Sequence, residues 1–129
     1  MPMSRDEVFA KVKDVLTTAL AVDDDEVTPQ AKLSEDLGAE SIDYLDIQFQ
    51  LEKAFGIKIP KGELTPENIF SNPEFVQNNK MTPKGLAELR LRMPFADLST
   101  FEADPDINNF RDVFTVDTLV SYVMTKVNP

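Results

Sequence analysis

Apolar residues recur at helical spacing in three stretches of the chain. The first stretch runs from about residue 5 to about residue 20, the second follows Glu40 and continues to about residue 54, and the third runs from residue 116 to residue 127. This period of three to four residues predicts amphipathic helices that bury one face. The apolar positions of the first are Val8, Val12, Val15, Leu16 and Leu20.

Residues at the ends of these stretches support the predicted bounds. Ser4 precedes two acidic residues, which is typical of a helix start. Gly56 follows the second stretch, where glycine commonly ends a helix. The third stretch has Asp117 in its first turn and Lys126 in its last, and the helix dipole favours both charges.

Residues 21–40 form a long connection with little strand signal. Acidic residues 23–26 break the first helix, and their spacing is not that of a calcium-binding loop, which needs a glycine and a closing glutamate. A loop of this length in a compact domain is usually functional or well packed. We expect Val27, Leu33 and Leu37 to hold it against the core.

Residues 61–113 differ in composition from the rest of the chain and contain five of its nine phenylalanines. Thr65-Pro66 and Thr82-Pro83 each place proline at a first helical position, which predicts two short helices. The expected fold is all-α: one domain over residues 1–129, an antiparallel bundle of three long helices, with short helices in an insert at about 61–113.

The second helix carries two apolar stripes on roughly opposite sides. A helix that only packs on a core needs one stripe, so the other is either covered or kept for a partner. We assign the longer stripe to the core and interpret the shorter one, which has an acidic rim, as a docking surface. The alternative is that the insert covers it. The longer stripe is Tyr44, Ile47, Leu51 and Phe55, and the shorter is Ile42, Leu45 and Phe49.

Charge and composition narrow the function. The formal net charge is −10, which makes nucleic acid a poor partner and basic protein surfaces a natural complement. No apolar run is long enough for stable membrane insertion, and the first residues do not resemble a signal peptide, so a cytoplasmic protein is expected. Histidine and cysteine are absent, which argues against a zinc site, a Ser-His or Cys-His pair, and an enzyme. We therefore predict no catalytic residues and no metal.

Ser41 lies where the long loop meets the second helix. A serine in this place is usually an N-cap. The same place also suits a phosphate ester, because backbone donors and the helix dipole favour a phosphate at a helix N-terminus. Glycine at position 38 would give an enzyme access to the hydroxyl. No base in this chain is available to activate the serine, so that chemistry must belong to a partner.

The stretch EDLGAESIDYLDIQFQLEKAFGIKIP, residues 35–60, resembles the signature of the acyl carrier protein family. The likeness extends over roughly residues 4–60 and 114–128. It implies that Ser41 carries 4′-phosphopantetheine. It also implies that acidic positions on the second helix meet basic patches of partner enzymes, with apolar positions between them. The acidic positions are Glu40, Asp43, Asp46 and Glu52, and the apolar ones are Ile42, Leu45 and Phe49.

The resemblance implies a monomeric carrier of acyl intermediates, held as thioesters, for fatty-acid or specialised lipid synthesis. Its expected partners are a phosphopantetheinyl transferase and acyl synthases and acyltransferases with basic docking patches. The acyl pocket is expected along the core stripe. Its residues would be Tyr44, Ile47, Leu51, Phe55 and Ile59.

The chain departs from the family pattern in several places. Glu40 stands where aspartate is usual, Ile42 where leucine is usual, and Lys53 replaces a common acid. These departures bear on which transferase loads the carrier and on the strength of the acidic patch. Two other readings stay open: a peptidyl or aminoacyl carrier, and an unmodified helical adaptor that uses the same two-faced helix.

The insert is much longer than the short third helix that the family has. Its basic helix after Thr82 is able to meet membranes or acidic partners, but we favour packing of its leucines and Met93 on the bundle. The aromatic residues and Met81 are expected to reshape the acyl pocket. The phenylalanines are Phe70, Phe75, Phe95, Phe101 and Phe110, and the cations of the stretch KMTPKGLAELRLRM, residues 80–93, are Lys80, Lys84, Arg90 and Arg92.

Overall fold

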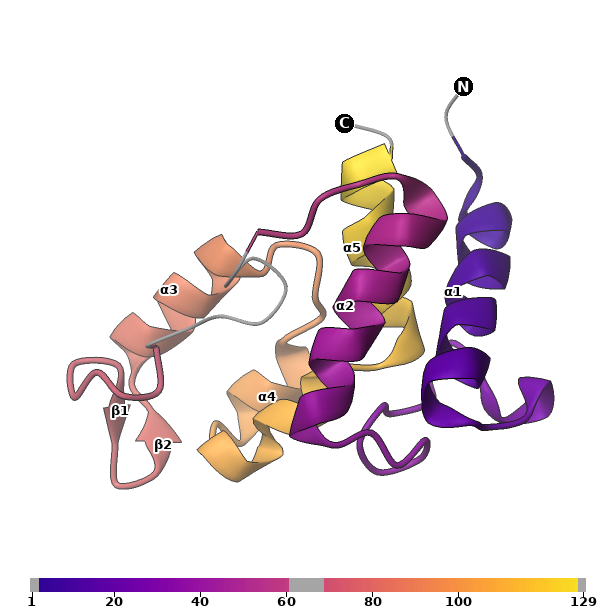
Figure 1. The fold of residues 1–129 in the computed structure, drawn as a ribbon. Coiled ribbons are helices and arrows are strands. Elements are labelled where there is room, and N and C mark those ends of the chain that lie inside the picture. Colours follow the sequence, from indigo (N-terminus) through magenta and orange to yellow (C-terminus); the bar gives the residue numbers. More distant parts are fainter. Residues whose placement is uncertain (1–2, 61–68, 128–129) are drawn as a thin grey trace.

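Three long helices form the centre of the molecule. A computed structural model describes residues 3–60 and 69–127, except the side chains of Ser41 and Arg111. The long helices are α1 (Arg5–Leu20), α2 (Ser41–Phe55) and α5 (Val116–Val127). Helix α1 packs against both others, and α2 and α5 run opposite to it (Figure 1). The three predicted helices are confirmed, and their bounds agree with the predicted ones within one residue.

The two ends of α1 show why this sequence forms a helix there. The amide of Glu7 donates to Ser4 Oγ at 3.2 Å, and the amide of Ser4 donates to Glu7 Oε1 at the same distance. This reciprocal pair satisfies backbone donors that the helix itself leaves free. Ala21 ends the helix with a positive φ of 54°.

One cluster of buried apolar side chains joins the bundle to the rest of the chain. In α1 it includes Val8, Val12 and Leu16, and α5 adds residues such as Leu119 and Val123. The predicted anchors of the long loop are confirmed, because Val27, Leu33 and Leu37 are all buried. The acidic run that breaks α1 continues as a short 3₁₀ helix, η1 (Asp24–Glu26).

The described part of the insert lies beside the bundle and contains more structure than predicted (Figure 1). The predicted helix after Thr82 is confirmed as α3 (Pro83–Arg92), where Thr82 caps the first turn. The helix predicted at Thr65-Pro66 lies outside the described residues. Three elements were not predicted: a β-hairpin, the short helix α4 (Ser99–Ala103) and the 3₁₀ helix η2 (Ile107–Val113).

The hairpin consists of β1 (Val76–Gln77) and β2 (Lys80–Met81), joined by two asparagines. Asn78 and Asn79 both have positive φ, 54° and 63°. Two consecutive positive φ angles are characteristic of a tight hairpin turn, and asparagine adopts them more readily than most residues. The hairpin therefore has a local cause in the sequence.

The basic helix of the insert packs on the molecule, as we favoured. Leu89 and Met93 are buried, and Leu86 is partly buried against the core. Its cations pair with local acids: Lys84 Nζ with Glu74 at 2.9 Å, Arg90 Nε with Glu102 at 2.7 Å, and Arg92 Nε with Glu88 at 2.9 Å. Each of the three cations of α3 is therefore paired with a carboxylate of the insert.

Candidate functional site

A tight turn delivers the chain to the start of α2. The backbone oxygen of Lys32 accepts from the amides of Asp36 (2.9 Å) and Leu37 (3.1 Å), and the amide of Ala39 donates to Leu33 O at 2.8 Å. Gly38 has a φ of 73°, a conformation that glycine adopts without strain. Gly38 thus has a defined conformation within an ordered turn. We had expected it only to give an enzyme access to the Ser41 hydroxyl.

The same loop is bonded to the start of α5. The amide of Leu33 donates to Phe114 O at 3.0 Å, and the amide of Val116 donates to Ala31 O at 3.0 Å. Leu37 and Ala39 are buried on either side of the turn. Because the loop is held at both its middle and its end, the first turn of α2 has a fixed position relative to the bundle.

The first turn of α2 is capped by acidic residues. Glu40 is the N-cap residue, with extended backbone angles, and its amide donates to Asp43 Oδ2 at 2.8 Å. Ser41 is therefore the first residue within the helix and does not occupy the N-cap position. The usual explanation of a serine at this junction does not apply here. Whether the Ser41 hydroxyl is exposed lies outside the described side chains.

The surroundings of Ser41 fit an attached phosphate. The residue opens a helix of 15 residues, whose N-terminal amides and dipole favour an anion. The two neighbours of Ser41 in the chain, Glu40 and Ile42, are both exposed. Two nearby carboxylates, Glu40 and Asp43, oppose the phosphate's charge, so a phosphodiester with its single charge fits better than a free phosphate monoester.

The shorter apolar stripe of α2 is open to solvent. Ile42 is 77% exposed, Leu45 is 59% exposed and Phe49 is 56% exposed. The alternative that the insert covers this stripe is therefore wrong for the described part of the chain. We call these three residues the α2 strip. Exposed apolar side chains placed together on one helix face are typical of an interaction surface.

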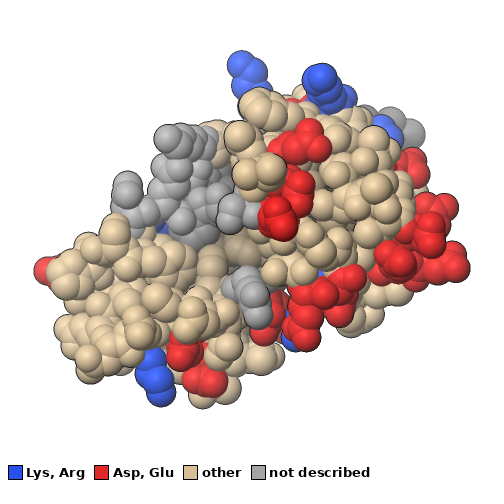
Figure 2. Space-filling model, turned by 60° about the horizontal axis from the view of Figure 1, so that its bottom comes forward, with Lys and Arg blue, Asp and Glu red and all other residues tan. Residues whose placement is uncertain are grey.

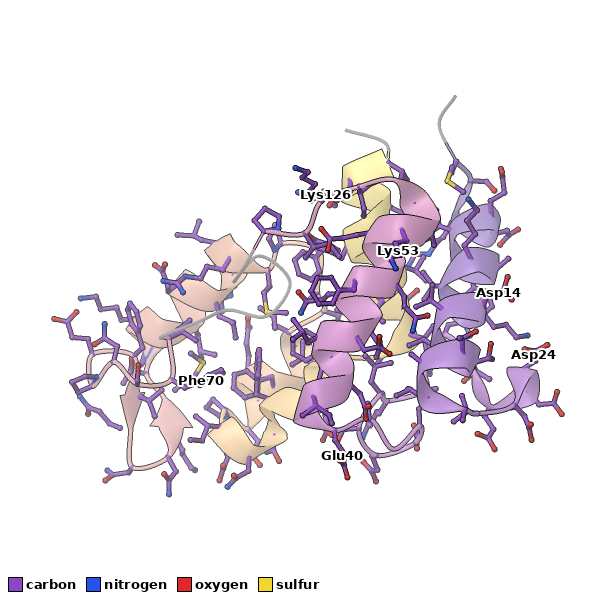
Figure 3. All side chains as sticks on the ribbon, in the orientation of Figure 1. Asp14, Asp24, Glu40, Lys53, Phe70 and Lys126 are labelled. Carbon is purple, nitrogen blue, oxygen red and sulfur yellow. The ribbon has the colours of Figure 1, made fainter. Side chains whose placement is uncertain are left out.

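The acidic rim divides into carboxylates with and without a role in the fold. Asp43 caps the helix, and Glu52 Oε2 accepts the amide of Ile59 at 3.1 Å, which ties the following segment to α2. Glu40 and Asp46 are exposed, and Asp46 Oδ2 accepts from the side-chain amide of Gln50 at 3.1 Å. Figure 3 shows Glu40 at one end of α2 and Lys53 toward the other.

The predicted pocket residues all contribute to the core. Ile47 and Leu51 are almost completely buried, and Ile59 is buried next to them. Tyr44 and Phe55 are half-buried and pack against the cluster, and Lys11 Nζ lies 5.5 Å from the centre of the Phe55 ring. The structure thus places this stripe inward, as predicted. Its use by an acyl chain remains a prediction.

A series of aromatic rings connects α2 to the insert, and the sequence did not reveal it. The ring centre of Tyr44 lies 5.9 Å from that of Phe114, which lies 5.4 Å from Phe110. Phe110 in turn contacts Phe70 at 4.8 Å and Phe101 at 5.6 Å. Phe70 lies on the insert side of α2 (Figure 3). We call these five residues the aromatic series. Their abundance was visible in the sequence, but their contacts were not.

Acidic side chains predominate over the bundle on the face drawn in Figure 2. Among the described residues, no group of three or more acidic side chains is close enough to hold a metal ion. None of the helices in that part of the chain is both long and apolar enough to span a membrane.

A comparison with family sequence profiles matches residues 10–72 to the phosphopantetheine attachment site, the PP-binding family. The matched range includes α2 and most of α1, and it ends before the β-hairpin. Most of the insert therefore lies beyond the part of the chain that the profile describes.

Several curated proteins are similar to between 46% and 60% of the chain. The acyl carrier protein of Thermotoga maritima is 44% identical over 61 residues, which cover 47% of this chain and 75% of that protein. The acyl carrier protein AcpXL of Brucella melitensis is 46% identical over 59 residues, 46% of this chain and 63% of that protein. The acyl carrier protein of Borreliella burgdorferi is 34% identical over 79 residues, 60% of this chain and 99% of that protein.

Proposed function

The chain belongs to the acyl carrier protein family, and we propose that Ser41 is the residue to which its phosphopantetheine arm is attached. Ser41 opens α2 within the matched range, at a helix N-terminus that suits a phosphodiester. The capping of α2 by Glu40 and Asp43 supports this assignment most directly, because it leaves the serine without a capping role.

The arm supplies a thiol, which this cysteine-free chain lacks, and the thiol carries an acyl group as a thioester. The residues of the chain perform a different task. The turn at residues 32–39 and the acidic cap fix the position of Ser41. Activation of the serine hydroxyl falls to the transferase, because the absence of histidine leaves no imidazole base in this chain. We therefore propose that the protein carries acyl groups for fatty-acid or specialised lipid synthesis and catalyses no reaction itself.

The α2 strip is our proposed docking surface for the transferase and for acyl synthases and acyltransferases. Its exposed apolar centre supplies area to bury, and Asp46 and Glu40 supply negative charge at its edge. Asp43 and Glu52 add negative charge to the same surface, and both also accept backbone hydrogen bonds that stabilise the fold. A basic patch on the partner would complement this arrangement, and such docking weakens with salt.

We propose that the acyl chain enters beside Tyr44 and follows the aromatic series toward the insert. Tyr44 is one helical turn after Ser41 and is only half-buried, so the series begins close to the arm. Ile47, Leu51, Phe55 and Ile59 would line the bundle side of this route. Loading the protein with acyl chains of increasing length should shift the NMR signals of Tyr44 first and those of Phe110 and Phe70 only with longer chains.

The attachment proposal is tested by intact-protein mass. Incubation with coenzyme A and a broad-specificity phosphopantetheinyl transferase should add one arm to the natural sequence and to Ser34→Ala, but none to Ser41→Ala. If the natural sequence gains nothing, Glu40→Asp restores the residue that is usual before the serine. An arm on Ser41→Ala would refute the assignment. Failure of both the natural sequence and Glu40→Asp to gain an arm would favour the unmodified adaptor.

The peptidyl or aminoacyl carrier is the rival within carrier chemistry. The group attached to protein purified from its native cell distinguishes the two, because a fatty acyl thioester and an aminoacyl thioester differ in mass and in reaction with amine reagents. We further propose that residues 1–129 act as one monomeric unit in the cytoplasm, with 61–113 as its insert. The single apolar cluster shared by the bundle and the insert supports the unit.

A further inference from the structure

A cleft of about 850 Å³ lies between the insert and the start of α5. Residues of α4 and η2 form one side, and residues 29–32 of the long loop and the first turns of α5 form the other. We call it the insert cleft. It contains none of the α2 strip, and most of its lining residues lie beyond the range that matches the family profile.

The apolar part of the insert cleft comes from the insert. Phe101 and Val113 are buried and line it, and Phe95 and Ala96 line it as partly buried residues. The Phe95 ring is held in place by Tyr122 of α5, with the ring centres 5.0 Å apart. The cleft therefore has a well-packed apolar surface. Burial of a methylene chain or an apolar side chain against it would lower the free energy of binding.

The charged part of the insert cleft is strongly acidic. Four aspartates line it, against one lysine. The lysine, Lys32, has its Nζ 3.8 Å from Asp112, and Arg5 pairs with Asp117 at the edge. The aspartates are Asp97, Asp104, Asp112 and Asp117.

Two of these carboxylates are bonded to neutral donors. Asp97 accepts from the amide and the hydroxyl of Ser99 at 3.0 Å and 2.6 Å, and Asp104 accepts from Asn109 Nδ2 at 3.2 Å. The Ser99 bonds hold the pKa of Asp97 below its ordinary value, so this carboxylate stays charged. Within the part of the chain that the structure describes, no lysine or arginine pairs with either aspartate.

We propose that the insert cleft is a second docking site, which binds an arginine- or lysine-bearing segment of a partner protein. Among the described residues no three carboxylates lie close enough to hold a metal ion, and positive charges spread along a peptide segment match separated aspartates. An acyl chain would gain nothing from four aspartates and would remove their hydration. Basic side chains satisfy both parts of the cleft, because their aliphatic stems lie on apolar surface while their charged ends reach carboxylates.

The proposal is tested on the full chain by NMR titration with an acetylated, amidated hexapeptide of alternating leucine and arginine. The peptide should shift the amides of Thr100, Asn109, Thr118 and Ser121 around the cleft, and its affinity should fall as salt is raised. The double substitution Asp97→Asn with Asp104→Asn keeps the local hydrogen-bond acceptors and should weaken binding roughly five- to tenfold.

Asp24→Asn with Asp25→Asn is the matched control, because it removes two exposed charges that lie outside the cleft. It should leave affinity within about twofold. Thr100→Trp fills the cleft without a change of charge and should abolish the cleft shifts, while circular dichroism verifies the fold. Equal weakening in both double variants would overturn the proposal, because it would show attraction by net charge alone.

Three other results would also overturn it: shifts confined to the α2 strip, spermidine binding as tightly as the peptide, or cleft shifts caused by a free fatty acid. The test uses protein without an arm, so its outcome is independent of Ser41. A failure here would leave the proposed attachment site untouched.

Discussion

The ring of Tyr44 on α2 contacts the ring of Phe114, which lies two residues before α5, with centres 5.9 Å apart and planes inclined at 59°. Phe114 is buried, and its backbone oxygen also accepts the amide of Leu33 from the loop that leads to Ser41. One residue therefore joins the site helix, the loop before it, and the insert. A structural change in the insert would therefore reach the start of α2 through Phe114.

Phe114→Ala should destabilise the protein by about 3–5 kcal/mol, the usual cost of removing a buried phenylalanine. The loss comes from the cavity and from the ring contacts with Tyr44 and Phe110. Urea denaturation monitored by circular dichroism measures it. Phe75→Ala is a useful comparison, since that half-buried ring is outside the aromatic series and should cost less. Equal losses of unfolding free energy in the two variants would contradict the central position of Phe114.

Gly85→Ala should destabilise the protein although alanine is the better helix former. A Cβ at Gly85 would lie 2.4 Å from the backbone oxygen of Phe75, and that oxygen already accepts the amide of Thr82. Helix and hairpin must separate, at a cost of about 1–3 kcal/mol that outweighs the gain in helix propensity of about 1 kcal/mol. Thermal unfolding measures the difference.

Ala87→Gly is the control for this substitution, because Ala87 is exposed on the same helix. It should cost roughly 1 kcal/mol through propensity alone. The close approach of α3 to the hairpin thus predicts that glycine is the more stable residue at position 85 and alanine the more stable residue at position 87. A stabilising Gly85→Ala would show that the two backbones have room to spare.

The insert was foreseeable as a unit but not in its internal arrangement. Thr82-Pro83 identified α3 because proline at a first helical position has a local physical cause. Asn78-Asn79 carried an equally local hairpin signal that we did not use. The aromatic series is different in kind, since the contacts of Tyr44 with Phe114 and of Phe70 with Phe110 join residues far apart in the chain and depend on the whole fold.

At the candidate site, the two stripes of α2 were predictable because helical geometry alone separates them. Whether the insert would cover the shorter stripe depended on where the insert lies, and that is a tertiary property. The acidic cap was missed for another reason. Glu40 and Asp43 have the spacing of a reciprocal cap, but we interpreted both only as surface charges.

Glu102→Gln should lower stability at neutral pH and make no difference in acid. The bond from Arg90 lowers the pKa of the Glu102 carboxyl, so the pair stabilises the folded protein above the ordinary glutamate pKa and is lost as pH falls through the lowered value. Melting temperatures of the two proteins should differ at pH 7 and converge below about pH 4. A difference that is constant with pH would contradict a role for this ion pair.

Phe49→Ala should leave stability nearly unchanged and weaken docking. Phe49 is 56% exposed, and surface substitutions usually change stability by less than about 0.5 kcal/mol. Truncation of a buried interface aromatic commonly costs about 1–2 kcal/mol, so kcat/KM of the transferase should fall roughly five- to thirtyfold. Leu91→Ala is the matched control, since Leu91 is 78% exposed on α3 and outside the α2 strip.

An unchanged kcat/KM for Phe49→Ala, or an equal loss for Leu91→Ala, would remove the α2 strip as the transferase's contact. Glu40 and Asp46 variants then become the next candidates, because both carboxylates are exposed at its edge. Their effect should shrink as salt is raised, since exposed charges are screened.

The location of the arm tests the account most directly. Cleavage after lysine releases residues 33–53, a peptide that contains two serines, Ser34 and Ser41. Fragmentation of this peptide from protein purified from its native cell assigns any attached group to one of them. We predict a phosphopantetheine, free or acylated, on Ser41 and none on Ser34. An unmodified peptide, or a group on any other residue, would contradict the assignment.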